Sequence, residues 1–385
     1  MRTKASVAMR KLSYRFQWRE NNHFTLLTDG RQFYPRMLEA VRTARSHVLL
    51  EMYLVESGSV VDQFIDAFAH AARSVVVCLL LDDYGARGLH HKDRARLLES
   101  GVRLVFYNPL RYGRLRQNFL RDHRKLLLVD GKVAYVGGMG ITDEFRSPTN
   151  SENDWHDVVV EIEGENVSDW QQLFLENWSK WNKTPLSLNQ YAGEYGGTQP
   201  GRVVIGQGVH RAEMQRSLIN RLRRAELRVW ISTAYFVPSW KLRRAIRHAA
   251  GKGIDVRLLL PGQYIDHPGV RHAGRRFYLR LLRSGVRIFE YQPRFIHSKV
   301  ALCDNWVSIG SSNNDRWSLR WNLEANQEVS DPGFAEIVST MFQDDFSVSK
   351  EWHLEQWYRR SWRKRMLEWF WGRIDRWLER HSRRR

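Results

Sequence analysis

Two stretches of the sequence, HRKLLLVD at residues 123–130 and HSKVALCD at residues 297–304, share the spacing His-x-Lys-x4-Asp. After the lysine, each stretch continues as an apolar run of strand type that ends at the aspartate. Residues two apart on a strand lie on the same face of it. The pattern therefore predicts two pairs of side chains that point the same way: His123 with Lys125, and His297 with Lys299.

The sequence around the two motifs repeats as well. Each motif is preceded by a strand of β-branched and aromatic residues, an amphipathic helical stretch, a second apolar strand, and a Gly-Val-Arg that opens a third strand. These segments are 47–55, 61–73, 75–81 and 101–107 in the first copy, and 228–237, 242–252, 256–260 and 285–291 in the second. A strand–helix–strand unit that occurs twice predicts an α/β protein built from two similar halves.

The length of the chain, 385 residues, also favours two halves over one ordinary core. We predict a first lobe at 1–185, a linker at 186–201 that is rich in Gly, Pro and polar residues, and a second lobe at 202–349. Residues 350–385 are basic and rich in Trp, and apolar residues recur at every fourth position. This last segment is predicted to be an amphipathic C-terminal helix.

Two histidines and two lysines on one surface suit chemistry at a phosphodiester. The ammonium groups can hold the non-bridging oxygens and stabilise the charge that develops in the transition state. One neutral imidazole can attack phosphorus, while the other, protonated, gives its proton to the leaving alkoxide. Each imidazole needs a partner that fixes its tautomer. Asp157 and Glu324, which follow the two motifs at similar distances, are the candidates, and the scheme needs no metal or other cofactor.

The charge of the chain points to partners that carry phosphate. The formal net charge is +19, which favours nucleic acid or anionic lipid headgroups, and the sixteen Trp are typical of cores, interfaces and the membrane boundary. No stretch approaches the about 18 uninterrupted apolar residues that span a bilayer, and the N-terminus lacks the apolar core of a signal peptide. We therefore expect the protein to stay in the compartment where it is made.

The duplicated motif, with the residues around it, resembles the phospholipase D superfamily. The resemblance covers about residues 17 to 345 and includes the IGSSNNDRWSL stretch at 309–319, the YFVP stretch at 235–238 and the WHD stretch at 155–157. These features and NLEAN at 322–326 are similar to bacterial cardiolipin synthases of the shorter type, which lack N-terminal membrane helices.

The resemblance implies two α/β/α sandwich lobes with one active site at their interface. It implies a phosphohistidine intermediate and transfer of a phosphatidyl group from phosphatidylglycerol to the hydroxyl of a second phospholipid. The near symmetry of the motifs leaves open which histidine is the nucleophile. The implied catalytic residues are His123, Lys125, Asp130, His297, Lys299 and Asp304, supported by Asp157, Glu324, Ser311 and Asn313. The first copy departs from the family pattern because Gly140 stands where the second copy has Asn313.

The C-terminal segment suggests where such an enzyme acts. A basic helix with Trp at its boundary is typical of an interfacial membrane anchor, so we expect a peripheral protein that binds the anionic cytoplasmic face of the cell membrane through 350–385. A helix packed on the lobes and a nucleic-acid-binding arm are the alternatives for this segment. For the whole protein, the alternatives are a phospholipase D-type hydrolase or nuclease, or a non-catalytic lipid- or nucleic-acid-binding protein. No obligate protein partner is inferred.

Overall fold

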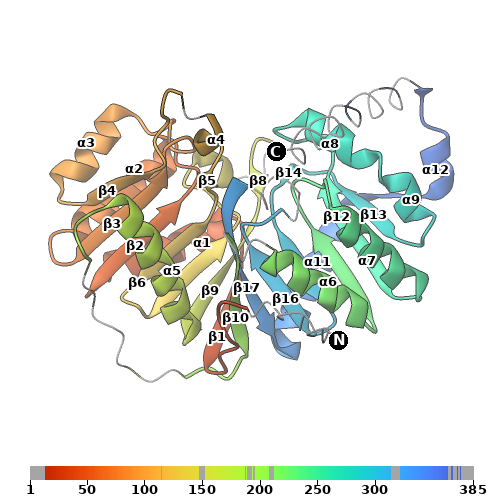
Figure 1. Ribbon diagram of the computed structural model, residues 1–385, viewed down its shortest axis with the longest axis horizontal. Helices are drawn as coiled ribbons and strands as arrows, with labels where there is room; N and C mark the ends of the chain where they lie inside the picture. The colour runs from red at the N-terminus through yellow and green to blue at the C-terminus, as the bar shows by residue number, and fades with distance from the viewer. Residues whose placement is uncertain are drawn as a thin grey trace, which may run out of the picture.

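Two lobes of similar architecture lie side by side in the computed structural model (Figure 1). The structure describes residues 14–113, 115–146, 152–186, 188, 193, 196–207, 212–313, 321–362, 366, 371 and 373. Each lobe is a mixed β-sheet with helices on both faces, so the predicted fold class of two α/β/α lobes is confirmed.

The first lobe is built on a seven-stranded sheet in which β2, β3 and β4 run parallel and β6, β7, β9 and β1 continue antiparallel. In spatial order the strands are β1 (Asn22–Thr28), β9 (Val158–Gly164), β7 (Val133–Gly137), β6 (Lys125–Val129), β2 (His47–Met52), β3 (Val76–Asp82) and β4 (Arg103–Tyr107).

The second lobe repeats this order and adds a strand at its far edge. Its strands are β10 (Gly201–Gly206), β17 (Asn322–Ser330), β16 (Trp306–Gly310), β15 (Val300–Cys303), β11 (Arg228–Ser232), β12 (Asp255–Pro261), β13 (Arg287–Tyr291) and β18 (Ser349–Trp352). Strand for strand, β6 of the first lobe therefore corresponds to β15, and β9 corresponds to β17.

Alternate residues of each central strand face different helices, as expected for a sheet covered on both sides. In β2, Leu50 belongs to a core with Phe64 of α2, whereas Leu49 belongs to a core with Trp170 of α5. The first-lobe helices are α1 (Gly30–Arg42), α2 (Ser59–Ala71), α3 (His91–Glu99), α4 (Leu115–Asn118) and α5 (Asn166–Trp181). Those of the second lobe are α6 (Glu213–Arg224), α7 (Trp240–Gly251), α8 (Pro268–Arg275), α9 (Tyr278–Leu282), α11 (Pro332–Ser347) and α12 (Leu354–Tyr358).

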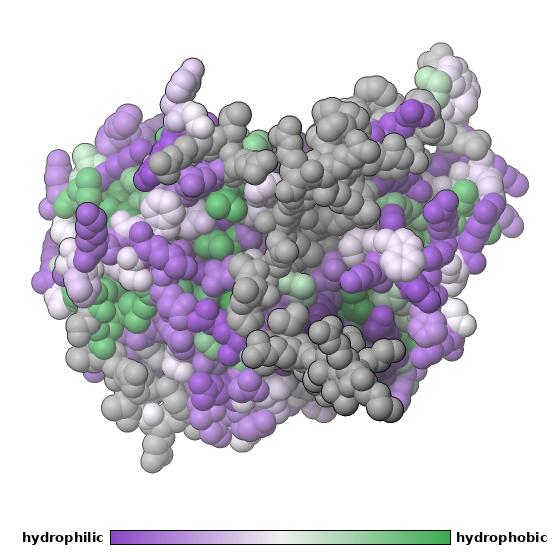
Figure 2. Space-filling model, in the orientation of Figure 1, coloured by the Kyte–Doolittle hydropathy of each residue, from purple (hydrophilic) through white to green (hydrophobic). Residues whose placement is uncertain are grey.

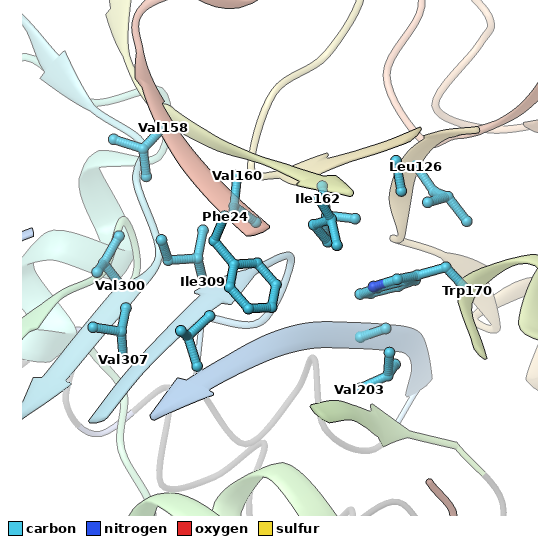
Figure 3. Close-up of a cluster of buried hydrophobic side chains, with 14 of the residues drawn as sticks. Phe24, Leu126, Val158, Val160, Ile162, Trp170, Val203, Val300, Val307 and Ile309 are labelled. Carbon is cyan, nitrogen blue, oxygen red and sulfur yellow. The ribbon is translucent and has the colours of Figure 1, made fainter. Parts of the chain in front are cut away.

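One continuous apolar core joins the lobes. Figure 3 shows Phe24 of β1, Trp170 of α5, Val203 of β10 and Ile309 of β16 in the same cluster. Helix α5 contacts β10 of the other lobe, and α11 contacts β1 in the same way. Because the long helices pack across the boundary, the lobes are held in one relative position, and this position fixes the geometry between the two motifs.

The prediction for the C-terminal segment is wrong at its beginning. Residues 349–352 are not helical but form β18, an edge strand that pairs antiparallel with β13. The short helix α12 follows and buries Trp357 against Trp352. Trp352 and Trp357 therefore pack on the second lobe, at the edge of its sheet. Most of the predicted amphipathic helix beyond residue 362 lies outside the described residues.

Candidate active site

Two very short strands bring the motifs of the two lobes together. The two-residue strand β5 (Arg121–Asp122) pairs in parallel with the beginning of β17, and β14 (Phe295–Ile296) pairs in parallel with β8 (Trp155–His156). The ladder continues for one hydrogen bond at each histidine: His123 N–H donates to Leu323 O at 3.0 Å, and His297 N–H donates to His156 O at 2.7 Å. Each motif is thus docked on the other lobe, directly before that lobe's candidate carboxylate.

This docking pairs each histidine with the carboxylate of the opposite lobe. His123 Nδ1 lies 3.0 Å from Glu324 Oε1, and His297 Nδ1 lies 2.7 Å from Asp157 Oδ2. Both carboxylates are completely buried. A carboxylate at Nδ1 fixes the tautomer of a neutral ring, with the proton on Nδ1 and the lone pair on Nε2. The sequence marked all four residues, but it did not indicate that the pairs cross between lobes.

The lysines lie beside the histidines, although the strands in the structure do not include the histidines: β6 begins at Lys125 and β15 begins at Val300. Lys125 Nζ donates to His123 O at 2.6 Å, and Lys299 Nζ lies 3.1 Å from His297 Nε2. Burial and the positive charge of Lys299, opposed by the negative charge of Glu324, together lower the pKa of Lys125 to about 7. The two ammonium groups therefore sense each other across the lobe interface, as expected if both face one bound anion.

The electrostatics favour the neutral form of both imidazoles. Burial lowers the pKa of His123, with a further contribution from Lys125 that Glu324 opposes. Burial and the charge of Lys299 lower the pKa of His297 to about 4, although Asp157 opposes them. Burial by itself would raise the pKa of Asp157, but Lys299 and His297 outweigh it and hold the pKa below its ordinary value. An anionic substrate would favour protonation of either ring.

The structure does not bring Asp130 and Asp304 into this cluster, so the prediction that grouped them with the catalytic residues is wrong in its geometry. Each lies at the far end of its strand, on the order of 16 Å from the lysine by strand geometry. Asp130 accepts backbone N–H groups of Arg45, Ser46 and His47, at 2.7 to 3.1 Å.

Asp304 makes the equivalent contacts with the backbone of residues 226–228. Both aspartates have left-handed backbone conformations, with φ of 58° and 51°, which Asp tolerates in turns. Asp130 anchors its hairpin turn to the beginning of β2, and Asp304 anchors its hairpin turn to the beginning of β11. The spacing shared by the two motifs therefore combines residues at the lobe interface with residues that hold a hairpin turn.

The two supporting residues of the second motif are buried next to the site. Ser311 Oγ donates to Glu324 Oε2 and accepts from Ala325 N–H at 3.1 Å, so it helps to hold the carboxylate that faces His123. Asn313 is buried, its backbone O accepts from Thr233 Oγ1 at 2.9 Å, and its side-chain oxygen has no hydrogen-bond partner among the residues that the structure describes. A buried amide oxygen without a partner is costly, which suits a group that meets substrate.

In the first lobe these positions are glycines for steric reasons. A Cβ at Gly138, the counterpart of Ser311, would lie 2.5 Å from Asp157 Oδ2. A Cβ at Gly140, the counterpart of Asn313, would lie 3.0 Å from Leu54 O and 3.2 Å from the Phe145 ring. The departure from the family pattern at Gly140 is thus matched by closer packing around it.

The residues described by the structure include no group of three or more His, Cys, Asp or Glu side chains arranged to hold a metal ion. Within the same residues, every helix is too short or too polar to cross a membrane.

Residues 37–178 and 218–346 match the family model described as cardiolipin synthase, PLD-like domain. This chain belongs to that family. Cardiolipin synthase B of Shigella flexneri is 34% identical over 330 residues, which cover 83% of this chain and 79% of the relative. Cardiolipin synthase A of Pseudomonas aeruginosa strain LESB58 is 34% identical over 355 residues, 89% of this chain and 70% of the relative.

Among solved structures, phosphatidylserine synthase from Haemophilus influenzae Rd KW20 superposes with a TM-score of 0.71 at 14% identity and covers 92% of this chain and 93% of that one. Polyphosphate kinase from Porphyromonas gingivalis has a TM-score of 0.56 at 17% identity, over 83% of this chain and 46% of the kinase. At these identities the two matches show only that the fold is shared.

Aromatic rings around the histidines complete the site of this family member, and sequence reasoning missed them. Trp155, Phe145 and Phe295 lie 5.1, 5.5 and 5.7 Å from the His297 ring, centroid to centroid, whereas Tyr53 lies 4.8 Å from His123. Trp155 lies in the WHD stretch and Tyr53 in the repeated segment 47–55, so these two belong to stretches that the sequence did mark. Their place in these stretches was the signal available in the sequence.

Proposed function

We propose that this protein is a cardiolipin-synthase-type phosphatidyltransferase that moves a phosphatidyl group from phosphatidylglycerol to the hydroxyl of a second phospholipid. The observation that carries the proposal is the pair of histidine–carboxylate contacts that cross between the lobes and bring both lysines within electrostatic range of both imidazoles. Membership in the cardiolipin synthase family supports the choice of substrate.

In the first step, Nε2 of one neutral imidazole attacks the phosphorus of phosphatidylglycerol. The bond from phosphorus to the glycerol headgroup oxygen breaks, and the other imidazole, protonated when the anionic substrate binds, gives its proton to that oxygen. Glycerol leaves and a phosphatidyl-histidine remains. Lys125 and Lys299 stabilise the charge on the non-bridging oxygens.

In the second step the roles reverse. The imidazole that lost its proton takes the proton of an acceptor hydroxyl, and the acceptor oxygen forms a bond to phosphorus as the bond to histidine breaks. Asp157 and Glu324 orient the rings and support whichever one is positively charged. Exclusion of water decides between transfer and hydrolysis, and the buried state of His297, 8% exposed, favours transfer.

The test is to incubate the purified protein with phosphatidylglycerol vesicles and to measure cardiolipin and glycerol. We expect both products in equal amounts, and their loss in His123→Ala and in His297→Ala. Phosphatidic acid in place of cardiolipin would favour a hydrolase instead. Salt-sensitive cleavage of DNA that depends on His123, without any lipid product, would favour the nuclease alternative.

We further propose that the protein docks on an anionic membrane surface, on its cytoplasmic side, with the second lobe as well as with residues 350–385. Residues 239–289 contain twelve Lys or Arg against two Asp or Glu, a net charge of +10 out of +19 for the chain. Arg244 and Arg280 are exposed there, and Trp240 is 55% exposed at the beginning of α7. Figure 2 shows mainly hydrophilic side chains over this part of the second lobe.

The basic residues of α7 and α9 lie close together, since Trp240, Arg243, Arg247 and Arg280 line one small cavity. Each Lys or Arg near an anionic membrane contributes about 1 kcal/mol of binding free energy. We expect Arg244→Glu with Arg280→Glu to weaken binding to phosphatidylglycerol vesicles by at least about tenfold. The matched control is Arg31→Glu with Arg42→Glu, the same charge change on exposed residues of α1. An equal loss in the control would contradict a specific docking face.

A further inference from the structure

A third histidine, His156, takes no part in the proposed chemistry and lies buried between two carboxylates at the lobe interface. His156 Nδ1 lies 2.8 Å from Asp29 Oδ1, and His156 Nε2 lies 3.1 Å from Asp345 Oδ1. Arg294 forms an ion pair with the other oxygen of Asp29. The Tyr291 ring stacks on the imidazole at 5.2 Å and 13°. We refer to Asp29, His156, Arg294 and Asp345 as the interface cluster.

The interface cluster joins the lobes with balanced charge. Asp29 and His156 come from the first lobe, and Arg294 and Asp345 from the second. Burial disfavours a charged His156, but Asp345 and Asp29 outweigh it and raise the pKa well above its ordinary value. The imidazolium and the guanidinium then neutralise the two carboxylates. A buried network of this kind is stable only when all its members are present.

The interface cluster is connected by hydrogen bonds to the His297–Asp157 pair. Asp29 N–H donates to Asp157 O at 2.9 Å, and Asp157 N–H donates to Asp29 Oδ1 at 3.3 Å. On the other side, His156 O accepts the backbone N–H of His297 at 2.7 Å. The backbones of both members of the pair are therefore held by residues of the cluster.

The backbone of Asp29 is strained, which singles it out. Its φ of 63° and ψ of 160° lie in a region that is essentially restricted to glycine. The next residue, Gly30, has no room for a side chain, because a Cβ there would lie 1.9 Å from Phe145 O. The Phe145 ring in turn contacts His297. Strain of this kind persists where the surroundings hold one conformation for a purpose other than stability.

We propose that Asp29 and His156 are positioning residues: together with Asp345 and Arg294 they hold Asp157 against His297, and they do so only when the two lobes are correctly docked. The inference rests on the proposed function, since it gives a role to a pair that this function uses. At the other pair the position of His156 is taken by Leu323, so the residue directly before Glu324 is apolar. The interface cluster therefore acts on His297 and not on His123.

Asp29→Asn tests this most cleanly, because Asn has the same size and shape as Asp and only the charge is lost. We expect kcat for cardiolipin formation to fall by about 10- to 100-fold, as for small misplacements of a catalytic group, with KM changed less than about twofold. Asp157 raises the pKa of His297, so the pKa of this residue in the pH dependence of kcat/KM should move down. His156→Gln should give the same two changes.

The control is Glu328→Gln, which breaks another buried ion pair, with Arg202, in the second-lobe sheet. It should lower Tm while kcat and the pH profile of the folded protein stay as in the wild type. If Asp29→Asn and His156→Gln behaved like this control, the inference would be wrong. Should either variant fail to fold, Arg294→Lys, which keeps the charge, provides the same comparison.

The failure of this inference can be told apart from the failure of the proposed function. If His297→Ala keeps full activity, the proposed function fails. If His297→Ala is inactive while the interface-cluster variants show wild-type kcat and pH dependence, only the positioning role fails.

Discussion

His123 and His297 occupy equivalent positions in the two lobes, but their surroundings differ. His297 lies among three aromatic rings and faces the shorter carboxylate, Asp157. His123 contacts the ring of Tyr53, is 13% exposed, and faces the longer carboxylate, Glu324. The two halves share the His and Lys residues and differ in the residues around them.

The supporting residues have changed in pairs. Glu324 and Ser311 in the second lobe correspond to Asp157 and Gly138 in the first. The longer Glu side chain is held by the Ser311 hydroxyl, whereas the shorter Asp side chain packs directly against the Gly138 backbone. Next to the motifs, Arg124 forms a buried ion pair with Glu51 at 3.1 Å, where the second lobe has Ser298 hydrogen-bonded to Ser232 at 2.7 Å. In each pair the two members are complementary to one another.

The largest expected effect is the loss of either carboxylate. We expect Asp157→Ala and Glu324→Ala to lower kcat by about 10³- to 10⁴-fold, as in other sites where a carboxylate fixes a catalytic histidine. Steady-state cardiolipin synthesis by each variant measures this. A loss in one variant alone would mean that the two pairs are not equivalent in function.

The next comparison concerns the buried ion pair beside His123. Glu51→Gln leaves the Arg124 charge buried without its partner and should destabilise the protein by about 3–5 kcal/mol. Ser232→Ala at the equivalent position should cost about 1 kcal/mol. Chemical denaturation of both variants gives the two values. Equal costs would show that the first-lobe network is not held by charge.

Exchange of the small residues should affect one lobe more than the other. Gly138→Ser forces Asp157 away from His297, and we expect kcat to fall by about 10²-fold. The reciprocal Ser311→Gly removes one hydrogen bond to Glu324 and should cost about 1 kcal/mol of activation free energy, roughly fivefold in kcat. The reverse order of effects would be inconsistent with the packing described for Gly138.

The smallest effect is one of pH dependence. Because burial lowers the pKa of Lys125 to about 7, its ammonium loses its proton as pH rises through about 7, and kcat/KM should decline there. Lys125→Arg keeps its charge, so the variant should be less active at pH 6 but should lack this decline up to pH 9. An unchanged alkaline limb would assign the decline to another group.

The sequence predicted the features of the fold that recur within each half. The alternation of the strands and the spacing of His123 with Lys125 are local patterns, and the duplication made them recognisable. Contacts between the halves have no such local pattern. The sequence therefore marked Asp157 and Glu324 as candidates without showing that each serves the histidine of the other lobe.

Two further features could not be separated by sequence alone. Asp130 and Asp304 recur with the histidines because the turn needs a carboxylate that accepts backbone N–H groups, and recurrence does not distinguish structure from catalysis. His156 adjoins Asp157 in the chain, but its importance depends on Asp345 from the other lobe. Likewise, residues 349–352 have no helical or strand pattern strong enough to reveal that they complete a sheet edge.

The central claim is that two histidines from different lobes form one site in which one carries the phosphatidyl group and the other moves the proton. The most direct test is to let the protein react briefly with phosphatidylglycerol, digest it without exposure to acid, and map the modified histidine by mass spectrometry. We predict a phosphatidyl adduct on only one of His123 and His297, absent when that residue is changed to Ala. Adducts on both histidines in the wild type, or on neither in any variant, would contradict the account.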